Sequence, residues 1–401
     1  MNIDDAQSNM DSYLRNPVAE ASTARLHDGH RCGPAGSYSR RGANTVLRLR
    51  CLDCPDQPRF STDPLSTHSQ LFPWVSRYRD DIAMNVINAY VDGRMSYRGL
   101  SLNSLGGNKV SSATAYRWVK AAAHQCKSPL EASTELQPVW GGSLQLDAFH
   151  VSVEGCARWA FLTLDSETQD IPHARVLRNE RDPRRIAKMC IELRDVLHYR
   201  PKIIVVDGNP SVLKAVRSIY PSVPIQLCVW HKEQTINKIL PNRKINANQR
   251  ELKVKIHEFL CANTLNEADT AYQFLIENSL IWPEKKSQNA IISLNRDRES
   301  LLAHFYVDAK FGLTEEKRAP RTTSVTEGTI SRFRLKLHQV HGFKSFENLP
   351  GLLNLLFMHH RAVPFRSGRD KRSPLQRAQR PVDNWLLFSQ RKSNNETDRQ
   401  V

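Results

Sequence analysis

Two aspartates stand in apolar runs, where an ionised side chain is costly unless it binds something. Asp147 lies within the run LQLDAFHVS, and Asp207 ends the run KIIVVDG. If these runs form neighbouring strands, the two carboxylates meet. Hard divalent cations such as Mg²⁺ prefer oxygen ligands, and two such ions about 4 Å apart can cleave a phosphodiester. The pair therefore predicts metal-dependent phosphodiester chemistry, although Asp207 taken alone could equally cap the next helix.

A third carboxylate is expected from the segment TTSVTEGTISRFR, where Glu327 is the best candidate. Three basic residues follow it, so the acid could bind metal while the bases contact DNA phosphates: Arg332, Arg334 and Lys336. The alternative is a solvated charged helix. Other acids in this part of the chain are Glu315, Glu316 and Glu347.

The surrounding pattern predicts an α/β sheet that would position these acids. Three apolar-rich runs predict strands, over residues 144–152, 157–166 and 171–179. An Asp-Pro pair then favours a helix start, and the predicted order continues as helix 182–199, strand 202–208, helix 211–220 and strand 224–231. This is the element order of a ribonuclease H-like sheet. Residues 233–310 are predicted to be mostly helical, and two further helices, separated near His341 and Gly342, are predicted over 321–361.

Several of these segments resemble the catalytic domain of Mutator-like transposases and their bacterial insertion-sequence relatives. The similar segments are LDAFHV, VVDGNPSVLKAV, LCVWH and TTSVTEGTISRFRLKLHQVHGFKSFE, and the resemblance runs from about Leu144 to Arg361. It implies an acidic triad of Asp147, Asp207 and Glu327 on a ribonuclease H-like fold. It also implies an all-helical insertion between the second Asp and the Glu, which suits the separation of 327 − 207 = 120 positions.

The same resemblance implies an activity and partners. The chain would be a DNA transposase that uses two Mg²⁺ (or Mn²⁺) ions to cleave DNA at transposon ends and to join those ends to target DNA. Its partners would be double-stranded DNA, namely terminal inverted repeats and target, and it would act as a homodimer or larger assembly.

The family also carries a C-x-x-H signature after the second Asp, matched here by Cys228 and His231. A Cys and a His at this spacing could bind zinc, but no second pair stands nearby in the sequence to complete four ligands. A structural role or contact with DNA fits the pair better, and a buried Cys beside a hydrogen-bonded His is the plain alternative.

Residues 25–70 have the outline of a zinc-ribbon-like DNA-binding module. The alternating run VLRLR predicts a strand that leads to Cys51 and Cys54, a close pair suited to metal binding. The first half of the ribbon is irregular, with His27 and Cys32 as its expected ligands. We therefore expect Zn²⁺ on Cys32, Cys51, Cys54 and His27, against the alternative of a degenerate ribbon with buried cysteines.

Residues 71–130 predict a helical, helix-turn-helix-like DNA-binding domain. Its last helix begins at a serine cap and places Tyr116, Arg117 and Lys120 on neighbouring turns, so Arg117 and Lys120 are candidate DNA contacts. A plain three-helix packing unit is the alternative. The catalytic domain is expected over 140–361, with its helical insertion at about 233–310.

Charge agrees with a nucleic-acid partner. The 401 residues hold 57 Lys and Arg against 41 Asp and Glu, a net charge of +16 that suits a polyanion. Residues 1–24 predict a flexible arm, and 362–401 a basic tail, extended along DNA or disordered. No apolar run reaches the roughly 20 residues of a membrane span, and no signal peptide is evident, so a cytoplasmic, nucleoid-associated protein is expected, without a disulfide framework.

Two other functions stay open at the level of sequence. A domesticated, non-catalytic DNA-binding regulator could keep the same fold, although all three acids are present. A ribonuclease H-like nuclease without joining activity would use the same carboxylates, because cleavage and strand transfer share one site.

Overall fold

The computed structural model describes residues 32–39, 45–51, 59–61, 80–92, 95–102, 109–241, 243, 246–314, 318–340, 343, 345–366 and 370–390, the first three ranges by their backbone alone. The chain divides into two compact units, Met1–Ala122 and Ala123–Val401. Among the helices of these described ranges, none is both long and apolar enough to cross a membrane.

The first unit holds an antiparallel sheet and three helices. The sheet has the order β1-β2-β3, with bounds Cys32–Ser39, Thr45–Cys51 and Arg59–Ser61. The helices are α3 (Asp80–Val91), α4 (Tyr97–Leu102) and α5 (Ser112–Gln125), the last of which ends beyond the boundary between the units. Ser111 Oγ accepts a hydrogen bond from Thr114 N at 3.1 Å, which is the serine cap that the sequence predicts for α5.

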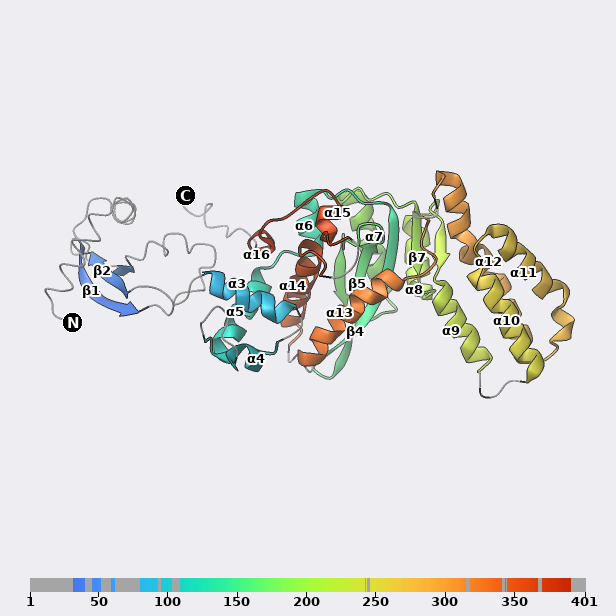
Figure 1. The fold of residues 1–401 in the computed structure, drawn as a ribbon, viewed down its shortest axis with the longest axis horizontal. Coiled ribbons are helices and arrows are strands. Elements are labelled where there is room, and N and C mark those ends of the chain that lie inside the picture. Colours follow the sequence, from blue (N-terminus) through green and yellow to red (C-terminus); the bar gives the residue numbers. More distant parts are fainter. Residues whose placement is uncertain are drawn as a thin grey trace. The chain divides into compact units, whose positions relative to one another are not determined.

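The second unit is built on a five-stranded mixed sheet, which confirms the predicted α/β class (Figure 1). Its order is β6-β5-β4-β7-β8, with β4 in the centre. The strands are β4 (Ser143–Val153), β5 (Cys156–Asp165), β6 (Ala174–Leu177), β7 (Ile203–Val206) and β8 (Ile225–Leu227). The pairs β4–β5 and β5–β6 are antiparallel, whereas β4–β7 and β7–β8 are parallel.

Short helices precede and connect these strands. They are α6 (Pro129–Leu136), α7 (Pro183–Ile191) and α8 (Pro210–Ile219). The Asp-Pro start is confirmed for α7, because the Asp182 side chain accepts a hydrogen bond from Arg185 N at 3.2 Å. The α-helical part of the predicted helix 182–199 is shorter than expected, since Glu192–Val196 continues it as a π-helical turn.

The region between β8 and the Glu327 segment is helical, as its sequence predicts. Its α-helices are α9 (Val229–Ile239), α10 (Ala247–Cys261), α11 (Leu265–Glu277) and α12 (Lys285–Phe311), with a 3₁₀ turn at Ser279–Ile281. In Figure 1 these helices gather beside the β8 edge of the sheet. Gln226 of β8, fully buried, joins the two parts: it donates to Leu301 O at 3.0 Å and accepts from His304 N at 2.9 Å.

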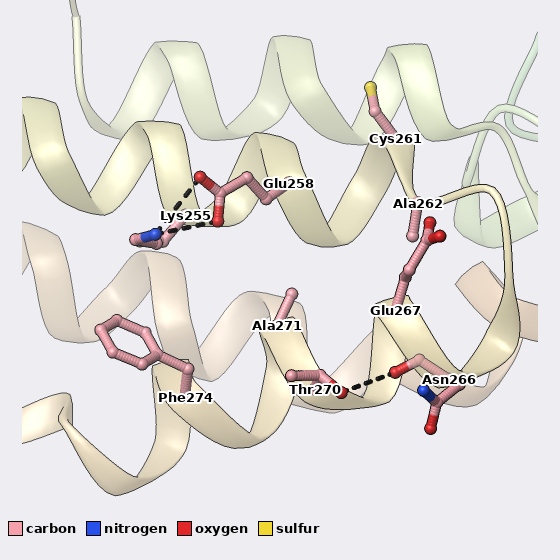
Figure 2. A pocket seen from close by; sticks show the side chains of 9 residues that line it. All are labelled: Lys255, Glu258, Cys261, Ala262, Asn266, Glu267, Thr270, Ala271 and Phe274. Atoms are coloured by element: carbon pink, nitrogen blue, oxygen red, sulfur yellow. Dashed lines mark hydrogen bonds and ion pairs between the residues drawn. The ribbon is translucent and has the colours of Figure 1, made fainter.

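A hollow of about 530 Å³ lies between α10 and α11 in this helical region. Figure 2 shows its lining side chains, among which Lys255 and Glu258 pair with each other at 3.0 Å. None of the three predicted carboxylates lines this hollow. Thr270 Oγ1 donates to Asn266 O at 2.8 Å in the same lining.

Four helices complete the second unit. They are α13 (Ser324–Val340), α14 (Asn348–Ala362), α15 (Pro374–Arg377) and α16 (Trp385–Ser389). Helix α13 packs on β4 (Figure 1). The Phe149 and Phe333 ring centroids lie 6.4 Å apart.

The described part of the predicted basic tail that spans residues 370–390 differs from the sequence prediction. Where an extended or disordered tail was expected, residues 370–390 include α15 and α16, and Leu375, Trp385 and Leu386 are buried. A backbone bridge pairs Cys126 with Gln390, and Lys127 N donates to Ser389 O at 2.7 Å. The segment is held because its few apolar side chains leave water.

A fully buried ion pair fastens α14 to the sheet's periphery. Arg361 donates to both carboxylate oxygens of Asp170, at 2.7 and 3.0 Å, and both side chains are 0% exposed. The guanidinium also donates to Pro129 O and Ser133 Oγ of α6, and Trp140 Nε1 donates to Asp170. Every charge here has partners, so removing one of them leaves the others buried and unpaired.

We expect Asp170→Ala to lower the free energy of unfolding by about 3 to 5 kcal/mol, because it strands the Arg361 guanidinium in the interior. Chemical denaturation of the full chain measures this. Asp195→Ala is the control, since Asp195 pairs with Arg194 on the surface and should matter little. A loss no larger in Asp170→Ala than in the control would contradict the structural role of the buried pair.

Candidate active site

Asp147 lies towards the middle of β4, the central strand of the sheet. Its side chain is half-buried, and its only hydrogen bond among the described residues comes from Ala148 N at 2.7 Å. Asp165 of β5 is a useful contrast, because its buried carboxylate accepts from Gly142 N, Thr168 and Tyr199 Oη. Asp165 is therefore satisfied within the fold, whereas Asp147 keeps oxygen lone pairs available for a ligand.

Asp207 directly follows β7, the parallel neighbour of β4. The ladder pairs Gln145 with Val205, so Asp147 and Asp207 each stand two residues beyond the same pair. Adjacent strands lie about 4.8 Å apart, which brings the two carboxylates to one place. The cap of α8 is Asn209, whose side chain accepts from Ser211 N. Capping therefore does not account for Asp207, which accepts a hydrogen bond from Asn209 N at 2.9 Å.

Glu327 lies in the first turn of α13 and is 31% exposed. Thr323 Oγ1 donates to its Oε1 at 2.7 Å. Glu347, a competing acid in the sequence, stands instead at the start of α14, and Glu315 and Glu316 lie outside the described residues.

The electrostatics of Asp147 indicate that Asp207 and Glu327 lie near enough to affect its carboxyl. Burial raises the pKa of Asp147 to about 7, the Ala148 amide opposes that rise, and the negative charges of Asp207 and Glu327 add to it. A half-buried carboxylate with other acids near it favours a cation, because a cation removes both the repulsion and the cost of burial.

A buried glutamine, which the sequence reading did not single out, positions Glu327. Gln145 precedes Asp147 by two residues on β4 and is fully buried. Its Oε1 accepts from Thr326 N at 3.2 Å and Thr326 Oγ1 at 2.7 Å, and its Nε2 donates to Thr322 O at 3.2 Å. The start of α13 is thus fastened to the strand that carries Asp147. The sequence signal was a lone amide in an apolar run.

Cys228 and His231 lie beside Glu327. The predicted strand 224–231 is too long, because β8 ends at Leu227 and Cys228 is the N-cap of α9, which carries His231 in its first turn. Thr323 N donates to Cys228 Sγ at 3.4 Å, and Thr323 Oγ1, which donates to Glu327, lies 3.3 Å from the same sulfur. His231 Nδ1 lies 3.7 Å from Glu327 Oε1.

Both residues of this motif have shifted pKa values. Burial raises the pKa of Cys228, but polar contacts with His231 and Thr323 outweigh burial, so its net direction is downward. The adjacent Cys228 sulfur, opposed by partial burial and assisted by the charge of Glu327, raises the pKa of His231. The C-x-x-H residues therefore belong to the electrostatic surroundings of the triad.

The predicted DNA-contacting bases fall into two groups. Arg117, Lys120 and Arg334 are exposed, and exposed Arg332 stacks its guanidinium 5.0 Å from the Phe365 ring centroid. The prediction that Lys336 contacts DNA is wrong, because its side chain is 1% exposed and cannot reach a DNA phosphate. Burial lowers the pKa of Lys336 to about 7. It follows Phe333 by three residues on α13 and so shares its buried face.

The predicted zinc ligands are partly within the described residues. Cys32 and Cys51 are paired across β1 and β2, a register that puts their Cα atoms opposite each other. His27 and Cys54 lie outside the described residues, as does the predicted arm 1–24.

Comparison with known proteins adds little to this geometry. No family model matches the chain, and no curated protein matches it. Among solved structures, it is similar to a chain of the "CryoEM structure of simian T-cell lymphotropic virus intasome in complex with PP2A regulatory subunit B56 gamma", at 12% identity and a TM-score of 0.19, over 45% of this chain and 70% of that chain. A likeness this weak carries no argument about fold or function.

The raised pKa of Asp147 predicts a pH-dependent cost to stability in the absence of metal. The folded chain holds this proton more tightly than the unfolded chain, whose carboxyl titrates near 3.8, so wild-type stability falls as the pH rises towards about 7. Asp147→Asn lacks this cost. In EDTA, its stability advantage over wild type should be roughly 2 to 3 kcal/mol greater at about pH 8 than at about pH 5.

Denaturation curves of both proteins at the two pH values measure this difference. Glu251→Gln, at an exposed position of α10, is the matched carboxylate-to-amide control. An advantage of Asp147→Asn that is equal at both pH values would mean that Asp147 titrates normally.

Proposed function

We propose that this chain is a DDE transposase, which cleaves DNA at transposon ends and transfers the ends to target DNA with two Mg²⁺ (or Mn²⁺) ions. The observation that supports the proposal is the placement of Asp147 and Asp207 at matching positions of the adjacent strands β4 and β7, with the charges of Asp207 and Glu327 adding to the raised pKa of Asp147. Three carboxylates offer the oxygen ligands that two hard divalent cations need.

The arrangement of the second unit supports a ribonuclease H-like assignment. Its strand order β6-β5-β4-β7-β8 combines three antiparallel strands with two parallel ones, the order expected for such a sheet. Helices α9 to α12 stand between Asp207 and Glu327, where the proposed family carries an all-helical insertion. The resemblance of the sequence to Mutator-like transposases points the same way.

In the proposed mechanism, the ions supply Lewis acidity to the phosphate and lower the pKa of the attacking hydroxyl. The residues of the chain hold the three carboxylates in position. Asp147 and Asp207 are presented by two adjacent strands, and Glu327 is presented by a helix that Gln145 fixes against one of them. Fixed placement of this kind contributes to rate because reacting groups need no further ordering.

Exposed arginine and lysine side chains would contact the DNA substrate. Arg334 stands on α13, two turns beyond Glu327, and Arg332 lies on the same helix. In the first unit, Arg117 and Lys120 of α5 are exposed for contact with phosphates. The proposed partners are terminal inverted repeats and target DNA, bound by a dimer or larger assembly.

Asp147→Ala should lower Mg²⁺-dependent cleavage and joining by about a thousandfold or more, while DNA binding and fold are kept. The assay uses labelled duplexes that carry the inverted repeats flanking the gene, and it scores cleavage and strand transfer separately. Asp195→Ala, an exposed change, serves as the control.

Three outcomes separate the candidate functions. Cleavage with joining, both lost in Asp147→Ala, supports the transposase. Cleavage without joining by the wild type indicates a nuclease, and binding without cleavage indicates a regulator. Wild-type rates in Asp147→Ala would refute the assignment of the triad.

We also propose that the amino-terminal segment binds one Zn²⁺ through Cys32, Cys51, Cys54 and His27. The opposed Cα atoms of Cys32 and Cys51 support this, because such partners on an antiparallel pair stand about 5 Å apart. Metal analysis of the full chain should find about one equivalent of zinc fewer in Cys51→Ser than in the wild type. Equal zinc content in the two proteins would exclude the site.

A further inference from the structure

Three different metal-binding atoms meet at the start of α9 and α13. Cys228, His231 and Glu327 bring one sulfur, one nitrogen and one carboxylate oxygen within 4.8 Å of one another. We propose that these three residues bind a thiophilic divalent cation such as Zn²⁺, at a site that shares Glu327 with the carboxylate triad. Such a cation would compete with the oxygen-bound ions for Glu327.

The surroundings of the sulfur favour a metal ligand. Cys228 is 1% exposed, yet its Sγ accepts a hydrogen bond from Thr323 N at 3.4 Å, and the Thr323 hydroxyl lies 3.3 Å away. Donors aimed at a sulfur stabilise its thiolate form, which is the form that binds metal. Hydrogen bonds to a ligand atom are also how proteins orient metal ligands.

The nitrogen supplies an independent observation. His231 Nδ1 is buried and forms no hydrogen bond of normal geometry within the described part of the chain; it lies beside the Cys228 sulfur and faces Glu327 Oε1 at 3.7 Å. A buried polar atom without a partner is costly, and the cost falls if the atom binds a ligand. A cation bound by Cys228 and Glu327 would satisfy this nitrogen.

The spacing requires a small adjustment. Donor atoms around a tetrahedral zinc ion lie roughly 3.3 to 3.8 Å apart, given bonds of about 2.0 to 2.3 Å, so the cluster would contract by about 1 Å. The side chains of His231 and Glu327 are 27% and 31% exposed, which leaves them room to move. Three protein ligands leave a fourth position open, so the cation could exchange with solvent.

Selectivity follows from the ligand set. A thiolate and an imidazole suit Zn²⁺, Co²⁺ and related ions, whereas Mg²⁺ prefers oxygen alone. One thiolate and one carboxylate also balance the charge of a divalent cation. The consequence for catalysis rests on the proposed function. When Glu327 binds a thiophilic cation, it can no longer serve as a ligand of the two Mg²⁺ ions. The binding itself does not rest on that proposal.

Cobalt titration of the full chain tests the site directly. Co²⁺ bound to thiolate gives a charge-transfer absorption, so both the number of equivalents and the ligand type can be measured. Cys228→Ser and His231→Ala should each bind one equivalent fewer than wild type. Cys156→Ser, which changes an exposed cysteine, is the matched control and should bind as many equivalents as wild type. Any cobalt bound elsewhere contributes equally to all four proteins.

The outcomes distinguish this site from the proposed catalysis. Asp147→Ala should keep the thiolate-to-cobalt charge-transfer absorption of the wild type while losing cleavage, because Asp147 is not one of the three ligands. Circular dichroism checks that each variant is folded, and His231→Ala decides the question if the buried Cys228→Ser does not fold. Wild-type cobalt stoichiometry in a folded His231→Ala would overturn the proposal. A wild type that lacks Mg²⁺-dependent cleavage would refute the proposed function and leave the cobalt result unaffected.

If both proposals hold, adding Zn²⁺ to a Mg²⁺-dependent cleavage reaction should lower the rate of the wild type and of Cys156→Ser alike. The cobalt stoichiometry, not this rate, decides whether the site exists.

Discussion

The position of Glu327 depends on one buried amide. Gln145 sits in the central strand with no access to water, so its oxygen and its NH₂ group must find partners within the protein. It finds them in Thr322 and Thr326, the residues on either side of the start of α13. The hydrogen bonds that the Gln145 side chain requires therefore fix the start of α13, although α13 is far away in the sequence. They also fix the position of Glu327, which follows Thr326 on that helix.

A second buried glutamine performs the corresponding task at the edge of the sheet. Gln226 of β8 binds Leu301 and His304 of α12, so the long helical region returns to the sheet at a fixed place. The loop that leads into α13 is then held by the start of α9, where Val229 N donates to Arg321 O and Cys228 Sγ accepts from Thr323. The side chains of Gln145, Gln226 and Cys228 thus hold the segment from Arg321 to Glu327 close to the strand that carries Asp147. These contacts do not depend on the length of the helical region between β8 and Glu327.

The sequence predicted what depends on local periodicity. Alternating and continuous apolar runs located β4, β5 and β7, and the carboxylates at Asp147 and Asp207 followed from them. The errors share a cause, because tertiary contacts override local pattern. The apolar residues of LCVWH continue past Leu227 and so predict a longer strand, but helix α9 begins at Val229. The sequence predicts that Lys336 lies on the charged face of its helix, but its helical spacing from Ile330 and Phe333 places it on the buried face. The tail has few apolar residues, and those few are enough to be buried.

The bridge between Cys126 and Gln390 joins the two ends of the second unit. This bridge joins residues that are synthesised far apart in time. Ribosomes add roughly 5 to 20 residues per second, so the sheet and the helical region emerge well before the segment that completes the unit. The contacts of residues 389 and 390 can therefore form only after both have left the ribosome, and a chain interrupted before α15 would expose the apolar surface that α15 and α16 cover.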